Sequence, residues 1–175
     1  MSASAIWRLP YVGSAPRQFS IVPPLLPYKV GEWALLDDLV YADLTGKLHL
    51  CPKHFITDLA SIPWLAEPIF NTVDSRLPGV MHDWLYCSSA VPRAECDALL
   101  KEMLLATGCD AVRANLIYAG VRVGGWKRYA ACAGGPKGED FAWEYMEPAE
   151  VSLYRSAYGL RPPISEVQHS TQLDP

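Results

Sequence analysis

A short stretch of the chain gathers residue types that could perform acid–base chemistry. It runs Gly79-Val80-Met81-His82-Asp83-Trp84-Leu85-Tyr86, and Asp97 follows in a second helical segment. Residues four apart share one face of a helix, so His82 and Tyr86 should point together, with Asp83 about a quarter turn away. If Asp97 meets His82, the pair would supply a general base with a free carboxylate beside it. The same residues could instead form a buried hydrogen-bonded network that fixes helix packing.

A second constellation lies upstream, in the run Phe55-Ile56-Thr57-Asp58-Leu59-Ala60-Ser61-Ile62-Pro63. It places Asp58 and Ser61 at the corner where a strand passes into a loop, and such residues commonly cap the local backbone there. In the functional interpretation, Asp58 joins His82 and Asp83 as a third polar ligand of a divalent metal. A mixed set of histidine and carboxylates suits zinc or manganese better than calcium. The sequence leaves both interpretations open.

Short strands precede the helices that would position these residues. The pattern predicts strands over 33–36, 40–42, 47–51 and 54–57, with a hairpin turn at Asp43-Leu44-Thr45-Gly46. Helices are predicted over 77–88, 93–107 and 110–129. Gly108 is placed to end the second helix, and Gly124-Gly125 should loosen the last turn of the third. We therefore expect an α+β fold in which a small antiparallel β-hairpin or meander packs on a three-helix unit.

Both ends of the chain differ in composition from the middle. Residues 1–31 and 147–175 are rich in proline and carry several aromatic side chains. We expect them to form extended arms, with at most a short helical turn around 149–157, on either side of a core domain over 32–146. Arms of this kind often lie on neighbouring subunits, although they could also wrap their own domain.

The overall composition excludes several classes of function. The 175 residues are 50% hydrophobic and 19% charged, enough apolar material for one core. A net charge of -4 argues against a nucleic-acid partner. We find neither a membrane span nor a signal peptide, and so expect synthesis in a cytoplasm. Five cysteines without C-x-x-C spacing indicate structural thiols. His49 and His54 are expected at the surface or in the hairpin.

The helix pair resembles the catalytic helices of secreted phospholipases A2, especially their compact prokaryotic and viral versions. The resemblance covers about 20 residues, and it implies that His82 activates a water, Asp83 binds calcium and Asp97 orients the imidazole, with Tyr86 supporting this network. The glycine-rich calcium loop of those enzymes has no counterpart upstream, where only Leu77-Pro78-Gly79 stands. Calcium requires six to eight oxygen ligands, more than Asp83 alone supplies.

The wider core resembles a tailed-phage and prophage family catalogued as domain of unknown function 1353. Its pattern is F-x-T-D-x-A-S-x-P, then H-D-x-L-Y, then a Glu-x-Asp helix and a third helix ending in Gly-Trp. The match extends from about residue 31 to 128 and includes Phe55, Thr57, Asp58, Ala60, Ser61, Pro63, His82, Asp83, Leu85, Tyr86, Asp97, Gly125 and Trp126. The resemblance implies phage origin and intracellular synthesis, and it brings no activity with it.

Two functions follow as expectations. The first is a structural or accessory virion protein of the tail, neck or baseplate, assembled in the host cytoplasm and anchored by its arms to other virion proteins or to copies of itself. The alternative is a metal-dependent hydrolase of the host envelope, acting on peptidoglycan or phospholipid through transient contact with that envelope. The catalytic residues would be His82, Asp97 and Tyr86. The metal, which could be zinc, manganese or calcium, would be held by Asp83, Asp58 and His82.

Overall fold

The strands of this protein precede its helices along the chain. The computed structural model describes residues 17–21, 23–59 and 73–160. The strands are β1 (Gln18–Ile21), β2 (Leu25–Lys29), β3 (Glu32–Leu35), β4 (Leu39–Ala42), β5 (Leu48–Cys51) and β6 (Ile56–Thr57). The helices are α2 (Val73–Ser88), α3 (Arg93–Ala106), α4 (Ala111–Gly124), α5 (Trp126–Ala131) and α6 (Pro148–Tyr158), with 3₁₀ turns η2 (Gly138–Asp140) and η3 (Trp143–Tyr145). The expected α+β class is confirmed.

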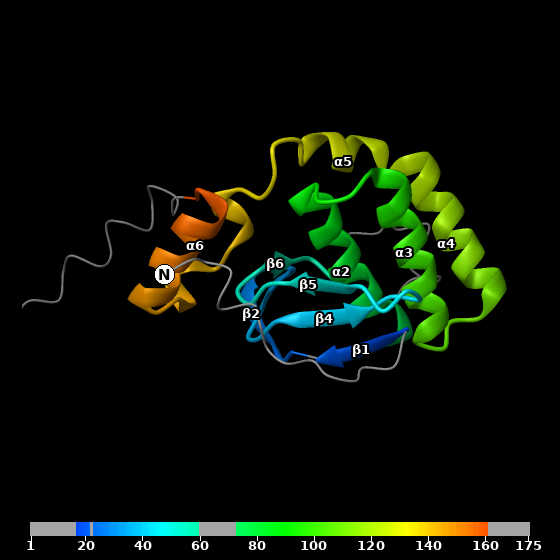
Figure 1. The fold of residues 1–175 in the computed structure, drawn as a ribbon, viewed down its shortest axis with the longest axis horizontal. Coiled ribbons are helices and arrows are strands. Elements are labelled where there is room, and N and C mark those ends of the chain that lie inside the picture. The colour runs from blue at the N-terminus through cyan, green and yellow to red at the C-terminus, as the bar shows by residue number, and fades with distance from the viewer. Residues whose placement is uncertain (1–16, 22, 60–72, 161–175) are drawn as a thin grey trace, which may run out of the picture.

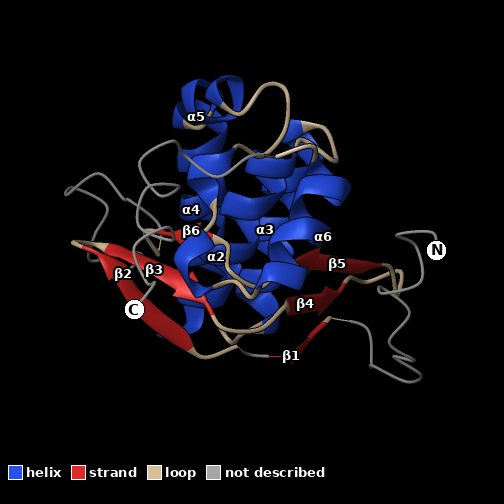
Figure 2. Cartoon of the chain, turned by 90° about the vertical axis from the view of Figure 1, so that its left-hand side faces the viewer, coloured by secondary structure: helices blue, strands red, loops and turns tan. Residues whose placement is uncertain are grey.

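The strands form two small antiparallel sheets rather than one meander. One sheet has the order β1-β4-β5 and the other β2-β3-β6. In the first sheet every residue of the central strand β4 is buried, while the β4–β5 hairpin turns at the predicted Asp43-Leu44-Thr45-Gly46. The Asp43 carboxylate accepts hydrogen bonds from Thr45 N and Lys47 N, and Gly46 adopts a φ of 81°. Figures 1 and 2 show the helices packed over these strands.

The three predicted central helices are present, with two changes. Helix α2 begins at Val73, before the predicted start, and carries Pro78 within its length. The predicted third helix is divided, because α4 ends at Gly124 and α5 begins at Trp126. In Figure 1, α3 lies between α2 and α4, and α5 covers the end of the bundle that faces away from the sheets.

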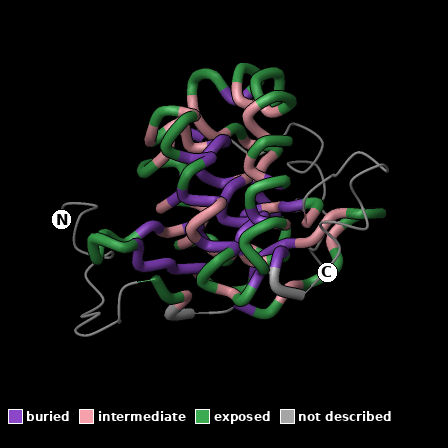
Figure 3. Tube along the Cα trace, turned by 90° about the vertical axis from the view of Figure 1, so that its right-hand side faces the viewer, coloured by how far each residue is buried: buried purple, intermediate pink, exposed green. Residues whose placement is uncertain are grey.

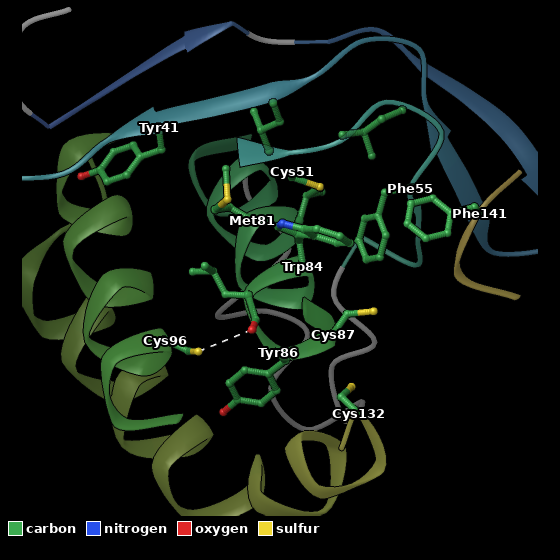
Figure 4. Close-up of a cluster of buried hydrophobic side chains, with 14 of the residues drawn as sticks. Tyr41, Cys51, Phe55, Met81, Trp84, Tyr86, Cys87, Cys96, Cys132 and Phe141 are labelled. Atoms are coloured by element: carbon green, nitrogen blue, oxygen red, sulfur yellow. Dashed lines mark hydrogen bonds between the residues drawn. The ribbon is translucent and has the colours of Figure 1, made fainter. Parts of the chain in front are cut away.

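An aromatic and sulfur-rich cluster joins the helices to the sheets. Phe55 beside β6, Trp84 on α2 and Phe141 after η2 meet edge to face, with centroids of Phe55 and Trp84 5.3 Å apart. Figure 4 shows these rings side by side, with Met81 and Cys51 beside them. Edge-to-face pairs contribute to stability beyond their buried area. The cluster therefore fixes α2, and the residues it carries, relative to the strands.

All five cysteines are free and buried, in agreement with the expectation of structural thiols. Burial raises the pKa of several of these thiols, including that of Cys96 to about 12. Such groups are protonated and unreactive at neutral pH. Within the residues that the structure covers, no helix is long and apolar enough to cross a membrane.

The described parts of the two arms pack against their own domain, which is one of the two arrangements that the sequence left open. In the N-terminal arm, β1 pairs with β4 and β2 pairs with β3. In the C-terminal arm, α6 packs through Tyr154, whose ring contacts Phe141 at 5.2 Å between centroids. The aromatic residues of the arms explain this packing, because they gain more by burial in their own domain than by exposure. Residues 1–16 and 161–175 lie outside the described residues.

A polar cluster completes the docking of α6. Glu150 accepts hydrogen bonds from Lys53 Nζ at 2.7 Å, His54 Nε2 at 3.2 Å and its own helix start at Glu147 N at 2.9 Å. Against burial, which acts in the opposite direction, these bonds lower the pKa of Glu150 to about 2. His54 is buried, and so is His49, which pairs with Asp43 at 2.8 Å. His49 lies in the hairpin, one of the two expected positions, but neither histidine is at the surface, because each has a carboxylate partner within the fold.

Replacing Glu150 with Ala should destabilise the protein by about 2 kcal/mol. The change removes three hydrogen bonds, one from the Lys53 ammonium group, one from the buried His54 and one from Glu147 N. Urea unfolding at pH 7 measures this loss. The control is Ser156→Ala, an exposed position on the same helix, which should change the free energy of unfolding by less than about 0.5 kcal/mol. Equal stability of the two variants would show that Glu150 does not dock α6.

Candidate functional site

The structure brings His82 and Asp97 together, as the sequence predicted. His82 lies in the middle of α2 and Asp97 in the first half of α3, and the loop 89–92 turns the chain so that the two helices pack side by side. His82 Nε2 and Asp97 Oδ1 are 3.0 Å apart. The His82 side chain is 10% exposed and that of Asp97 is 0% exposed. The pair is therefore a histidine at the edge of the interior bonded to a fully buried carboxylate.

Two further side chains hold Asp97. Tyr86 Oη donates to Asp97 Oδ1 at 2.5 Å, and Arg122 Nη1 on α4 donates to Asp97 Oδ2 at 2.8 Å. Burial alone would raise the pKa of Asp97, but the hydrogen bonds from His82, Tyr86 and Arg122 outweigh it and lower that pKa below its ordinary value. Asp97 is therefore a buried carboxylate that stays ionised.

The sequence did not identify Arg122 as a site residue. It lies 25 residues from Asp97, and only the antiparallel packing of α3 and α4 brings the two together. Arg93 reinforces the contact: its Nη2 donates to Arg122 O at 2.8 Å, and its Nε lies 4.0 Å from Asp97 Oδ2. A buried aspartate needs a positively charged partner. The sequence could therefore indicate that Asp97 has such a partner, but not that the partner is Arg122.

The two ring nitrogens of His82 have different surroundings. Nε2 faces Asp97. For Nδ1 there is no hydrogen bond to another described residue, and this atom is not one of the fully buried polar atoms that lack a partner. The imidazole also packs on the Tyr86 ring, with centroids 4.2 Å apart. The carboxylate bond therefore orients the ring, and it leaves the opposite nitrogen as the atom that can exchange a proton with a substrate or water.

Asp83 differs from Asp97 in its exposure and in the direction of its pKa shift. It is only partly buried and accepts one hydrogen bond, from Thr57 Oγ1 at 3.1 Å. Burial and the nearby negative charge of Asp58 raise the pKa of Asp83 to about 6, against smaller opposing effects of His82 and Arg128. The predicted grouping of Asp58, His82 and Asp83 is thus real as a neighbourhood, with two carboxylates that repel each other beside a histidine.

The neighbourhood does not by itself make a metal site. Over the described residues, no group of three or more His, Cys, Asp and Glu side chains has the geometry to hold a metal ion. His82 Nε2 is already bonded to Asp97, so His82 can either bind a metal or take a proton through Nδ1, but not both. Ser61, at the predicted strand-to-loop corner, lies outside the described residues. The metal stays a prediction, and no chemical step below depends on it.

Gly125 explains part of the Gly-Trp pattern at the end of the third predicted helix. A Cβ atom on Gly125 would lie 2.6 Å from both Tyr86 Oη and Val121 O, which is closer than such atoms approach in proteins. Only glycine therefore lets the α4–α5 junction pack against the hydroxyl that Asp97 binds. Figure 4 shows the Tyr86 hydroxyl directed away from the aromatic cluster, toward these outer helices.

Comparison with known proteins places this core in a family. The model of a protein of unknown function, DUF1353, matches residues 33–121, about half of the chain. The chain belongs to the DUF1353 family. Its matched part contains β3 to β6, α2, α3 and most of α4, including His82, Asp83, Tyr86 and Asp97. The expectation of membership is confirmed, whereas the phage origin that accompanied it stays a prediction.

A curated relative extends this result without adding an activity. The uncharacterized protein y4iH of Sinorhizobium fredii (strain NBRC 101917 / NGR234) is 30% identical over 129 residues, which is 71% of this chain and 47% of that protein. The chain thus spans about half the length of the curated relative that it matches. No solved structure matches this DUF1353 protein.

Asp83→Asn should make the protein more stable at pH 7, by about 1–2 kcal/mol, when measured with a chelator present. Because folding raises the pKa of Asp83 from 3.8 to about 6, its contribution to stability is full below pH 4 and is lost as the pH rises through about 6. Urea unfolding from pH 4 to pH 8 should show a flatter profile for the variant. Glu139→Gln, at an exposed carboxylate, should keep the wild-type profile. A lower stability of Asp83→Asn than of the wild type at pH 7 would contradict the raised pKa of Asp83.

Gly125→Ala and Gly124→Ala should act in opposite directions. Alanine at 125 should destabilise the protein by about 1–3 kcal/mol, because its Cβ would meet both the Tyr86 hydroxyl and Val121 O. Alanine at 124, in a helix with nothing within 4 Å of its Cβ, should stabilise it by about 0.5–1 kcal/mol. Thermal unfolding measures both. Restoration of Gly125→Ala by a second change, Tyr86→Phe, would attribute the loss to the hydroxyl.

Proposed function

We propose that this protein is a hydrolase that cleaves an ester or amide bond of the host envelope, in phospholipid or peptidoglycan, with His82 as the general base. The observation that carries the proposal is the 3.0 Å bond between His82 Nε2 and the fully buried Asp97, with the opposite nitrogen of His82 left for exchange. A buried carboxylate behind an imidazole fixes its tautomer and stabilises the imidazolium that forms when it takes a proton.

The chemistry follows from the two nitrogens. Neutral His82 carries its proton on Nε2, facing Asp97, and accepts a proton from a water molecule at Nδ1. The water oxygen attacks the carbonyl carbon of the substrate, and the imidazolium then returns the proton to the leaving group. Asp97 stays ionised throughout, because the hydrogen bonds from Tyr86 and Arg122 keep its pKa low despite burial.

Asp83 supports this proposal over a purely structural network. A buried network that only held the helices together would favour groups whose charge is satisfied. The pKa of Asp83 is instead raised by burial and by Asp58, so its ionised form costs stability at neutral pH. Groups that cost stability beside an oriented base are typical of functional sites. Asp83 and Asp58 would face the substrate side of His82, where they could polarise or position the attacking water.

His82→Ala should lower the rate of ester hydrolysis by at least about 100-fold. The assay uses short-chain and long-chain phospholipids and purified peptidoglycan, with and without added divalent metals. His49→Gln is the matched control, because His49 also forms a buried pair with an aspartate, Asp43, at 2.8 Å, but in the β4–β5 hairpin. It should keep full activity. An unchanged rate in His82→Ala, with the fold confirmed by circular dichroism, would sink the proposal.

A structural or accessory role in the virion is the second candidate, and it is compatible with the first. The observation that favours it is the exposure of two leucines on the β4–β5 hairpin, Leu44 at 52% and Leu48 at 46%. Apolar side chains at a hairpin can bind a neighbouring subunit of a tail, neck or baseplate. Mass spectrometry of particles purified from the producing host tests this role, and absence of the protein from particles would rule it out.

A further inference from the structure

The outward face of α4 and α5 is apolar. Val112, Leu116 and Val123 recur at helical spacing along α4, and Trp126 follows at the start of α5; their exposed fractions are 71%, 55%, 79% and 57%. The opposite face of α4 packs on α3 through Ala114 and Ile117. Helices of this size usually turn polar side chains to solvent. We name these four exposed residues the α4–α5 stripe.

The charges around the stripe have one sign. Residues 111–138 contain Arg113, Arg122, Lys127, Arg128 and Lys137 and no aspartate or glutamate, which gives this segment a formal charge of +5 in a chain of net charge -4. Arg122 is bonded to Asp97. In the part of the chain that the structure describes, no ion pair neutralises Lys127, Arg128 or Lys137. Lys127, Arg128 and Lys137, near the α5 end of the stripe, therefore keep their positive charge without an ion pair among the described residues.

The stripe is placed where a large partner can reach it. In Figure 1, α4 forms one flank of the molecule and α5 the end farthest from the sheets. Figure 3 views the molecule from the side of α4. It shows exposed residues over much of these outer helices and buried residues behind them. Lys127 Nζ lies 5.5 Å from the centroid of the Trp126 ring, so a cation and an exposed indole sit together at this end.

We propose that the α4–α5 stripe binds the surface of a bilayer rich in anionic phospholipids. Apolar side chains on one side of a helix, with only basic residues around them, match the amphipathic segments that lie in the headgroup region. Indole rings favour that region, and each basic residue near an anionic surface strengthens binding about fivefold. The inference goes beyond the proposed hydrolysis, and the four residues of the stripe are not among those that bond to His82 or Asp97.

Charge complementarity decides for a membrane over a second copy of the chain. Pairing two copies through this face would bring the unpaired cations Lys127, Arg128 and Lys137 of both copies together, and like charges at an interface oppose association. An anionic bilayer instead accepts both the cations and the apolar side chains. Exposed apolar residues elsewhere lack this setting: Val30, the most exposed, lies between Lys29 and Glu32 in the β2–β3 turn.

Co-sedimentation of the full chain with vesicles tests the proposal. The vesicles contain phosphatidylethanolamine with 30% phosphatidylglycerol, and vesicles of phosphatidylcholine serve as the neutral comparison. We expect binding to the anionic vesicles that weakens as NaCl rises from 50 to 500 mM, because salt screens the surface charge. Equal binding to both vesicle types, or no binding to either, would overturn the proposal.

Matched variants locate the surface. Lys127→Glu should weaken binding about 30-fold, because it changes two units of charge. Lys29→Glu is its control, since Lys29 also lies over an aromatic ring, that of Tyr28, but on β2. Val123→Ser should weaken binding several-fold, whereas Val30→Ser should not. If each stripe variant and its control lost the same amount of vesicle binding, the stripe would not be the binding surface.

His82→Ala separates the two proposals. It should bind vesicles as the wild type does, because His82 lies outside the stripe, so a failure of hydrolysis leaves the binding result intact. Analytical ultracentrifugation supplies the remaining comparison. A dimer that Val123→Ser dissociates and Val30→Ser does not, in a protein that fails to bind anionic vesicles, would assign the stripe to a second copy and overturn the membrane proposal.

Discussion

The burial of one ionised carboxylate, Asp97, organises the helical half of this protein. A carboxylate with no exposed surface is costly unless its oxygens are bonded, and here three helices contribute to that requirement. His82 and Tyr86 come from α2 and Arg122 from α4, while Asp97 itself belongs to α3. The helix packing and the orientation of the histidine are therefore consequences of the same constraint.

The two aspartates beside His82 divide the work of the site. Asp97 is held ionised behind the ring, whereas Asp83 is partly buried and has a pKa raised to about 6 by burial and by Asp58. Asp97 thus fixes the orientation of the imidazole, whereas the ionised form of Asp83 lowers the stability of the fold. A raised carboxylate pKa beside an oriented histidine is expected at a functional site. It has no purpose in a network that only holds helices together, because an unfavourable charge does not stabilise their packing. The proposals on hydrolysis and on membrane contact both place function on the helices.

Local patterns predicted the fold better than they predicted the partners. Helical spacing was sufficient for the His82–Tyr86 face and for the boundaries of α3, because these depend on residues close in sequence. The bond from Arg122 and the close approach of Gly125 to Tyr86 depend on how α4 crosses α2 and α3, and no local signal encodes that crossing. The proline-rich composition of residues 17–31 concealed two strands, since pairing with β3 and β4 decides their conformation. Burial of His54 depends on Glu150, far away in the chain.

The sharing of Asp97 among three helices has a consequence for how the protein folds. The bonds to Asp97 span only 11, 15 and 25 positions along the chain, so the helical half has short loops to close and should assemble early. The docking of α6 on Lys53 spans 97 positions, so it closes a much longer loop and should come later. We therefore expect a folding intermediate in which Asp97 already orients His82 while α6 has not yet docked. In such a chain the slowest amide protons to exchange would lie around α2 and α3.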